Sequence, residues 1–356
     1  MKKKVISMLL TAGLVLGLTA CAGGGGDSGE ASASGKGELN IFVWTEYVPE
    51  SVVSAFEEKT GIKVNVSTYS SNEDMLAKVK AESEGAFDIV QPSDYMVKQM
   101  IDQDMLQKLE KEKLTNLSNI SEAYANPSYD PSGEYSVPYL GGVGAIAVNT
   151  GKITASVSKY ADLFTADFKD SLVVLDDFRA TIGMAARSLG YSMNETDPAK
   201  LEEIKIQTLK LKDNIKLYDS DSPKSALISG DCTAGFCWSA EAALAMEENP
   251  DIQIVYPEEG AYLFMDNWCI TKGAKNVDAA TEFINYMLEA ETGKSVSEEF
   301  PYLQPNKAAV ELLGSEYADN PAKNVPEDVI SKGEYVENLD TDTLEIYDSI
   351  WTELKK

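Results

Sequence analysis

The sequence has 356 residues, enough for about two domains at roughly 150 residues each. Its 44% hydrophobic and 25% charged residues are typical of a globular protein and exclude a largely disordered chain. The 58 acidic residues against 31 basic ones give a formal net charge of -27, which argues against a nucleic-acid partner because phosphates are neutralised by clustered Lys and Arg. Histidine is absent, which removes His-dependent hydrolase triads and His-ligated zinc sites without excluding other catalysis.

Residues 1–20 have the features of a secretory signal peptide. Three lysines precede an apolar stretch, residues 5–18, that is too short for a comfortable membrane span. The segment Leu18-Thr19-Ala20-Cys21 is similar to the lipobox of bacterial lipoproteins, where the peptide is cut before a cysteine that carries a diacylglycerol; an ordinary signal peptide with an incidental cysteine is the alternative. Residues 21–37 are rich in Gly and Ser and predict a flexible tether. We therefore expect an extracytoplasmic protein held to a membrane by a lipid on Cys21.

Three further cysteines follow, at positions 232, 237 and 269. Because their number is odd and no Cys-x-x-Cys spacing occurs, neither a complete set of disulfides nor a metal or redox motif is indicated. We expect buried, inert thiols, with a Cys237–Cys269 bridge as the alternative.

From Leu39 onward the hydrophobic pattern alternates between strands and helices. In the first half we expect strands at 39–44, 62–66 and 87–90, and helices at 49–59, at 72–84 and from Ser93. Further on we expect strands at 137–149, 171–175, 235–238, 252–256 and 262–270, and helices at 177–189, from 198, and at 239–247, 277–290 and 341–354. The repeated β-α-β order predicts two α/β lobes, each a mostly parallel sheet flanked by helices, with the ligand in the cleft between them.

No catalytic motif commits the chain to chemistry. No Gly-x-Gly-x-x-Gly sequence follows a predicted strand, and the phosphate-loop pattern that would end at Ser295 has Leu288 where it needs Gly. A carboxylate pair for glycoside hydrolysis is not excluded in a chain with 58 acidic residues.

The segment Trp44-Thr45-Glu46-Tyr47-Val48-Pro49 places two aromatic residues around an acid directly after a predicted strand. With several later segments it resembles the bacterial spermidine/putrescine-binding proteins, the solute receptors of polyamine ABC importers. The resemblance runs over the whole mature chain and is carried by 57–64, 67–69, 92–95, 113–116, 136–139 and 305–306. It implies a two-lobed periplasmic-binding-protein fold of type II, with lobe 1 formed by 38–143 plus 265–310 and lobe 2 by 144–264 plus 311–356.

The resemblance also implies a set of polyamine-binding residues. Carboxylates bind ammonium groups through charge-assisted hydrogen bonds, and aromatic rings cover the methylene carbons and attract cations through their faces. The positions that match the family's binding residues are Trp44, Glu46, Tyr47, Ser93, Tyr95, Asp177, Ser220, Trp238, Phe264, Asp266 and Tyr302.

Three positions depart from the family pattern. Ala180 stands where spermidine binders often have Glu, and Phe264 stands where the family has Trp. The family's late Gln aligns with Val336 or Glu337. The polyamine class is unaffected by these changes, but the preferred polyamine is left open, and the missing acid at 180 leads us to expect that putrescine competes better against spermidine.

We therefore expect a lipid-anchored receptor that binds a polyamine and delivers it to an ABC permease, with no catalytic step, cofactor, metal or nucleic-acid partner. Three alternatives stay open at this point: the same fold binding another cationic solute, a surface glycosidase, and an adhesin.

Overall fold

The computed structural model describes residues 37–356, so the predicted signal peptide, the tether up to residue 36 and Cys21 lie outside the described residues. The strands are β1 (Glu38–Trp44), β2 (Lys63–Tyr69), β3 (Ile89–Val90), β4 (Ser136–Asn149), β5 (Leu172–Val174), β6 (Ile215–Tyr218), β7 (Ala234–Trp238), β8 (Ile252–Val255), β9 (Tyr262–Ile270) and β10 (Glu334–Tyr335).

The helices are α1 (Glu50–Thr60), α2 (Asn72–Ala81), α3 (Asp94–Asp102), α4 (Phe178–Ser188), α5 (Pro198–Leu209), α6 (Lys224–Ser229), α7 (Ser239–Glu248), α8 (Val277–Met287), α9 (Ala290–Glu299), α10 (Lys307–Ala318), α11 (Glu327–Lys332) and α12 (Thr341–Leu354). Short 3-10 turns lie at 111–113, 117–119, 160–164 and 166–168.

The strands form one sheet in the order β2-β1-β3-β9-β4-β7-β5-β6, with β10 added to β9 and β8 to β4. Strands β1, β2 and β3 are parallel, as are β5, β6 and β7, which agrees with the β-α-β pattern. Strand β9 runs antiparallel to β3 and β4, and β4 runs antiparallel to β7 and β8. The sheet is therefore mixed: parallel pairing joins β1 to β2 and β3, β5 to β6 and β7, and β9 to β10, whereas the central pairs of β9 with β3 and β4 and of β4 with β7 and β8 are antiparallel.

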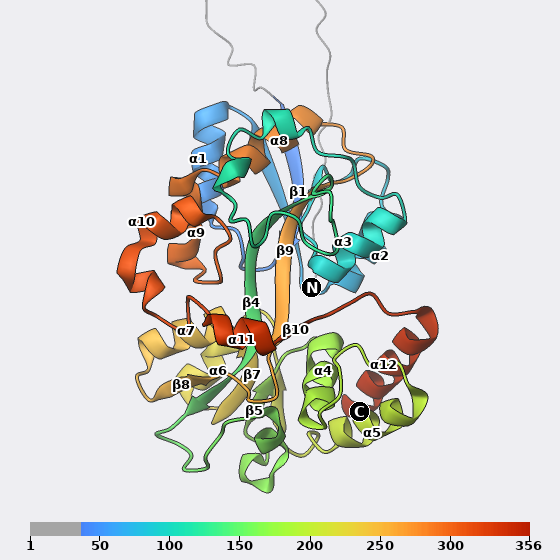
Figure 1. Cartoon of the computed structure of the whole chain (residues 1–356), viewed down its shortest axis with the longest axis vertical. Coiled ribbons are helices and arrows are strands. Elements are labelled where there is room, and N and C mark those ends of the chain that lie inside the picture. Colours follow the sequence, from blue (N-terminus) through green and yellow to red (C-terminus); the bar gives the residue numbers. More distant parts are fainter. Residues whose placement is uncertain (1–36) are drawn as a thin grey trace, which may run out of the picture. The chain divides into compact units, whose positions relative to one another are not determined.

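Two lobes share this sheet because β4 and β9 run through both of them (Figure 1). We call the part around β1, β2 and β3 lobe 1 and the part around β5, β6 and β7 lobe 2. The pairing of β4 with β9 extends from Ser136↔Cys269 to Gly144↔Tyr262, so the two crossings lie side by side. Gly142 of β4 allows the Phe264 ring of β9 to pack closely, since a Cβ at position 142 would lie 2.9 Å from that ring.

Burial of apolar faces explains the helix positions. Helix α1 buries Val52 and Phe56 against lobe 1 and ends at Gly61, whose φ of 74° suits a residue without a side chain. In lobe 2, Asp177 precedes α4, and its side chain caps the helix by accepting a hydrogen bond from the backbone N–H of Ala180.

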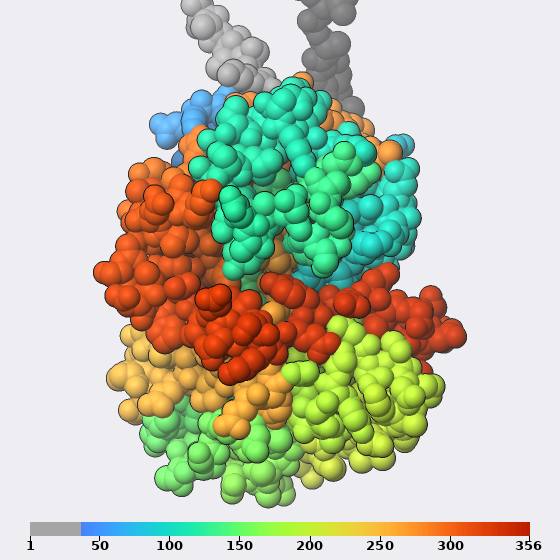
Figure 2. Space-filling view, viewed as in Figure 1, coloured from blue at the N-terminus to red at the C-terminus, as the bar shows by residue number. Residues whose placement is uncertain are grey.

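The chain crosses between the lobes a third time after α10. In Figure 2 the orange-to-red stretch that contains α10, α11 and the residues after α11 passes over the boundary between the lobes. Helix α10 packs against α9 and the turn at 117–119, on lobe 1, while α12 packs against α4 and α5, on lobe 2. The predicted lobe limit at residue 310 falls within α10, whose backbone leaves helical angles at Gly314 (φ 66°).

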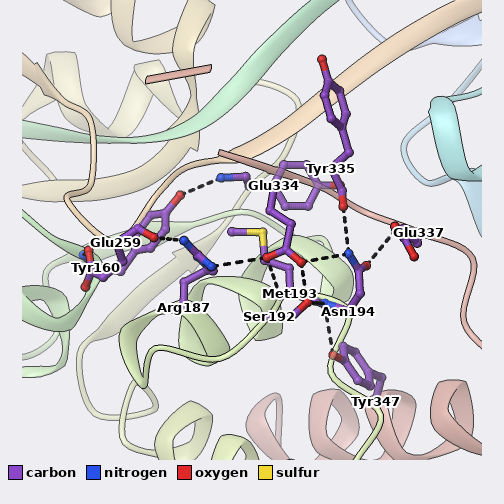
Figure 3. Close-up of polar contacts among 11 residues, drawn as sticks. Tyr160, Arg187, Ser192, Met193, Asn194, Glu259, Glu334, Tyr335, Glu337 and Tyr347 are labelled. Atoms are coloured by element: carbon purple, nitrogen blue, oxygen red, sulfur yellow. Dashed lines mark hydrogen bonds and ion pairs between the residues drawn. The ribbon is translucent and has the colours of Figure 1, made fainter. Parts of the chain in front are cut away.

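Glu334 connects this third crossing to lobe 2 through hydrogen bonds and an ion pair (Figure 3). Its carboxylate accepts hydrogen bonds from the Ser192 hydroxyl, from the Met193 backbone N–H at 3.1 Å and from the Asn194 side chain at 3.3 Å, and it pairs with Arg187 at 3.4 Å. The Asn194 side chain also donates a hydrogen bond of 2.9 Å to the backbone carbonyl oxygen of Tyr335, the residue after Glu334. The path of the chain after α11 is thus fixed by side chains that follow α4.

Cys232, Cys237 and Cys269 are buried and free, and burial raises the pKa of each thiol. The alternative of a Cys237–Cys269 bridge is not seen. Among residues 37–356, no helix is long and apolar enough to cross a membrane.

Candidate functional site

A pocket opens where the ends of strands from both lobes meet at the β9 crossing. Its walls come from the turn after β1, the start of α3, the N-terminus of α4, the turn after β6, the end of β7, and β9 itself. The residues that line it are Trp44, Thr45, Glu46, Tyr47, Ser70, Asn72, Ser93, Asp177, Ser220, Asp221, Trp238, Tyr262, Phe264, Asp266 and Tyr302.

The turn 44–47 projects from the end of β1 into this pocket. Glu46 has a φ of 49°, in the left-handed region that costs a non-glycine residue on the order of 1 kcal/mol. The turn is held in place because the Tyr139 hydroxyl donates a 2.8 Å hydrogen bond to the backbone carbonyl of Tyr47. The indole N–H of Trp44 and the hydroxyl of Tyr47 are buried without a hydrogen-bond partner, so both are available to a ligand.

Asp266 lies on β9 at the floor of the pocket and is only 4% exposed. The Ser93 hydroxyl donates a 2.6 Å hydrogen bond to its Oδ1, and no ion pair with it occurs in the part of the chain that the structure describes. Burial raises the pKa of Asp266 from its ordinary value to about 7, although the hydrogen bond from Ser93 opposes the rise. A buried carboxylate without a counter-ion favours the binding of a cation.

Asp177 supplies a second carboxylate from lobe 2. It is half-buried, and burial is the main cause that raises its pKa, while its hydrogen bond from Ala180 opposes the rise. The same side chain therefore caps α4 and faces the pocket.

The turn after β6 brings a third carboxylate, Asp221. Asp219 shapes this turn by accepting hydrogen bonds of 2.9 Å from the backbone N–H groups of Asp221 and Ser222. Ser70 of lobe 1 donates a 3.2 Å hydrogen bond to Asp221 Oδ2, which connects the lobes, and the buried hydroxyl of Ser220 has no partner. Burial, followed by the neighbouring carboxylates Asp219 and Glu46, raises the pKa of Asp221.

Aromatic rings form the walls between these acids. The ring centroids of Trp238 and Phe264 lie 5.0 Å apart, those of Tyr47 and Tyr302 lie 5.2 Å apart, and those of Trp238 and Tyr262 lie 5.7 Å apart. Such rings bury apolar carbon and attract cations through their faces.

A wider acidic groove adjoins the pocket and shares Ser70, Asp177, Ser220 and Asp221 with it. The groove adds the carboxylates of Glu73, Asp74, Asp176, Asp219, Glu345 and Asp348. A cleft lined by charge of one sign raises the local concentration of the opposite ion. Among residues 37–356, no group of acidic or cysteine side chains is arranged to hold a metal ion. The arrangement suits a ligand with separated positive charges on an apolar chain.

A family model of the bacterial extracellular solute-binding proteins matches residues 51–325 of the chain. The chain belongs to this family. The assignment makes it an extracytoplasmic binding protein rather than an enzyme, and it sets aside the glycosidase and adhesin alternatives.

This solute-binding protein is 38% identical over 356 residues to the spermidine/putrescine-binding periplasmic protein of Salmonella typhimurium, covering 100% of this chain and 99% of the relative. A structure from Listeria monocytogenes, assigned to spermidine/putrescine ABC transport, is 33% identical, has a TM-score of 0.86, and covers 89% of this chain and 98% of its own. A lipoprotein of Treponema pallidum is 28% identical with a TM-score of 0.78, covering 89% and 99% of the two chains. The predicted two-lobed fold is confirmed by these matches.

All the binding residues that the sequence resemblance implies lie in the pocket except Tyr95. Tyr95 is buried, with its hydroxyl donating to Glu73 at 2.9 Å and its ring facing the guanidinium of Arg179, 5.2 Å from the ring centre. Arg179 and the α2 residues Asn72 and Glu73 contact Tyr95, which does not line the pocket.

The three departures from the family pattern also have defined places. Ala180 is fully buried and does not line the pocket. Phe264 lines it. Val336 is buried and Glu337 exposed, and neither lines the pocket.

Several lining residues were absent from the prediction: Thr45, Ser70, Asn72, Asp221 and Tyr262. Two of them lay within reach of sequence reasoning, since Asp221 follows Ser220 directly and Tyr262 stands two residues before Phe264 on the same face of a strand.

Proposed function

We propose that this protein captures a polyamine of the spermidine/putrescine class outside the cytoplasm and passes it to an ABC permease. The observation that carries the proposal is the uncompensated buried carboxylate of Asp266 beneath aromatic walls. The names of the Salmonella typhimurium and Listeria monocytogenes proteins point to the same ligand class.

The pocket chemistry matches this ligand. One ammonium group lies against Asp266 and receives a charge-assisted interaction that is stronger than in water because the site is buried. The methylene chain then passes between the rings of Trp238, Phe264 and Tyr302, where each ring-ammonium contact adds about 0.5–2 kcal/mol. The other amine reaches a carboxylate of lobe 2, Asp177 or Asp221.

Binding involves both lobes, since Asp266 and the 44–47 turn are joined to lobe 1 while Asp177 and Trp238 belong to lobe 2. A ligand that contacts both lobes stabilises the closed arrangement by its differential affinity for it. The closed form is the state that we propose is presented to the permease.

The lipid anchor on Cys21 belongs to the same proposal. It rests on the sequence Leu18-Thr19-Ala20-Cys21 and is supported by the lipoprotein relative in Treponema pallidum. Expression in a bacterial host with a radiolabelled fatty acid tests it: label and membrane association should be present in the wild type and lost in Cys21→Ala. A protein that carries no label in the wild type would overturn the anchor.

A thermal-shift panel with putrescine, spermidine, spermine, arginine and glucose tests the ligand class, because a ligand that binds only the folded state raises the melting temperature. We expect shifts with the polyamines that vanish in Asp266→Asn and persist in Asp167→Asn, an exposed acid outside the pocket. A shift with arginine alone would assign another cationic solute.

A further inference from the structure

Lys224, the first residue of α6, connects two carboxylates at the mouth of the pocket. Its Nζ lies 2.9 Å from Oε2 and 3.1 Å from Oε1 of Glu241, which is buried. The same Nζ lies 3.7 Å from Oε2 of Glu46 on the other lobe. Neither Lys224 nor Glu241 belongs to the pocket lining, whereas Glu46 does.

The two contacts of Lys224 differ in kind. The pair with Glu241 has hydrogen-bond geometry and buries the carboxylate, whose side chain is 6% exposed. The contact with Glu46 exceeds hydrogen-bond distance, and the Glu46 side chain is 56% exposed. Lys224 is therefore anchored on lobe 2 by Glu241, and its hold on Glu46 is loose enough to be exchanged for another cation.

The pocket has no other such contact. Its lining contains four carboxylates, Glu46, Asp177, Asp221 and Asp266, and no Lys or Arg. Of these four, Glu46 is the one that forms an ion pair with a cation of the described chain.

We propose that Lys224 is an internal counter-ion that competes with the ligand for Glu46 and so limits how many ammonium groups the pocket accepts. The inference rests on the proposed polyamine function and deepens it. With Lys224 in place, Glu46 already faces a cation at 3.7 Å, and a third ammonium at the mouth meets a fixed positive charge. A diamine that pairs with Asp266 and one acid of lobe 2 leaves Glu46 unused, whereas a triamine brings a further ammonium group that can reach Glu46.

A simple latch between the lobes is the rival explanation. An ion pair at this distance with the Glu46 side chain 56% exposed contributes little to holding the lobes together, because solvent screens it and the Glu46 side chain loses freedom. The two explanations predict opposite results when the charge of Lys224 is removed: competition predicts tighter binding of a triamine, and a latch predicts weaker binding of every ligand.

The test is calorimetric titration of putrescine and spermidine into the wild type and into Lys224→Met/Glu241→Gln, in which the second change avoids an unpaired buried carboxylate. We expect the affinity for spermidine to rise by about three- to tenfold and that for putrescine by less than about twofold, since the removed charge acts most on the ammonium nearest to it. Lys59→Met/Glu289→Gln, which removes an exposed ion pair of lobe 1 and, like the test variant, leaves the net charge unchanged, is the matched control.

Two further variants separate this role from a structural one. Lys224→Arg keeps the charge and should keep the wild-type ratio of the two affinities. Glu46→Gln should weaken spermidine binding more in the double variant than in the wild type, because only there is Glu46 free for the ligand. An unchanged ratio in the double variant, or a loss of both ligands, would overturn the inference while leaving the proposed function standing. Absence of polyamine binding by the wild type would overturn both.

Discussion

The hydroxyl of Ser93 donates a 2.6 Å hydrogen bond to Oδ1 of Asp266, joining the start of α3 to the strand that crosses between the lobes. Ser93 is itself held by Asn72, whose side chain accepts from the Ser93 backbone N–H at 3.2 Å. These neutral partners orient the carboxylate without neutralising it. The site is therefore held in a geometry that only a cation completes.

Replacing Asp266 by Asn should remove this interaction while keeping the shape of the side chain. We expect polyamine affinity to fall by about 2–4 kcal/mol, the range for breaking a buried charge pair. Calorimetry on the folded variant measures it, with Asp167→Asn as the exposed control. An affinity within threefold of the wild type would show that Asp266 does not bind the ligand.

Ligand affinity should depend on pH through the same residue. Because the pKa of Asp266 in the empty site is about 7, binding of an ammonium group below that pH requires the carboxyl to lose its proton. We expect affinity to be constant above about pH 8 and to fall toward a limit of about tenfold per pH unit below pH 7. Titrations at pH 5.5, 7 and 8.5 in one buffer system test this, and a flat profile would contradict it.

The stability of the ligand-free protein should decrease as pH rises, whereas its affinity for the ligand should increase. Burial also raises the pKa of Asp94 to about 8, so between pH 4 and 7 the folded carboxyls of Asp94 and Asp266 hold protons that the unfolded chain has released. Stability then decreases as pH rises through this range, by up to about 1.4 kcal/mol per unit for each group. Melting temperatures should be higher at pH 5.5 than at pH 8, and Asp266→Asn should reduce the difference. A pH dependence of the melting temperature that is the same in the wild type and in Asp266→Asn would contradict a raised pKa of Asp266.

Position 180 should influence the choice of polyamine. Ala180 is buried one turn along α4 from Asp177, so Ala180→Glu adds a carboxylate behind an existing one. We expect the ratio of spermidine to putrescine affinity to increase, with Ala180→Gln as the uncharged control of the same size. If the ratio stays unchanged in a variant that still melts cooperatively, then residue 180 does not sense the third amine.

Lobe closure should be visible in solution. The Ser70–Asp221 hydrogen bond of 3.2 Å spans the cleft, so the arrangement described above is one in which the lobes touch. We expect small-angle scattering to show a smaller radius of gyration with saturating polyamine than without it, and no change for Asp266→Asn at the same ligand concentration. A wild-type profile that does not respond under verified saturation would mean that the lobes are fixed.

Most strands and helices could be predicted from the sequence because each has its own hydrophobic period, but β6, β10, α6, α9, α10 and α11 were not predicted. Strand direction could not be predicted: β4 and β9 are buried along their whole lengths and carry no pattern that tells parallel from antiparallel pairing. The predicted helix 277–290 is in fact α8 ending at Met287 and α9 starting at Ala290, with neither Gly nor Pro at the break.

The site could be predicted where residues are adjacent in the chain, as in the 44–47 turn. It could not be predicted where two lobes meet. Nothing near Tyr95 in the sequence indicates that Arg179 covers its ring, and nothing near Glu46 indicates that Lys224 lies opposite. Such contacts depend on the fold as a whole.

The three crossings between the lobes leave the two ends of the folded body on different sides of the hinge. Strand β1 begins in lobe 1, and α12 ends in lobe 2 against α4 and α5. A donor fluorophore joined ahead of β1 and an acceptor joined after α12 would therefore move with different lobes. Any closing of the cleft then appears as a change in energy transfer, which makes the two ends of the described residues, 37 and 356, suitable attachment points for an optical sensor without altering a single residue of the pocket.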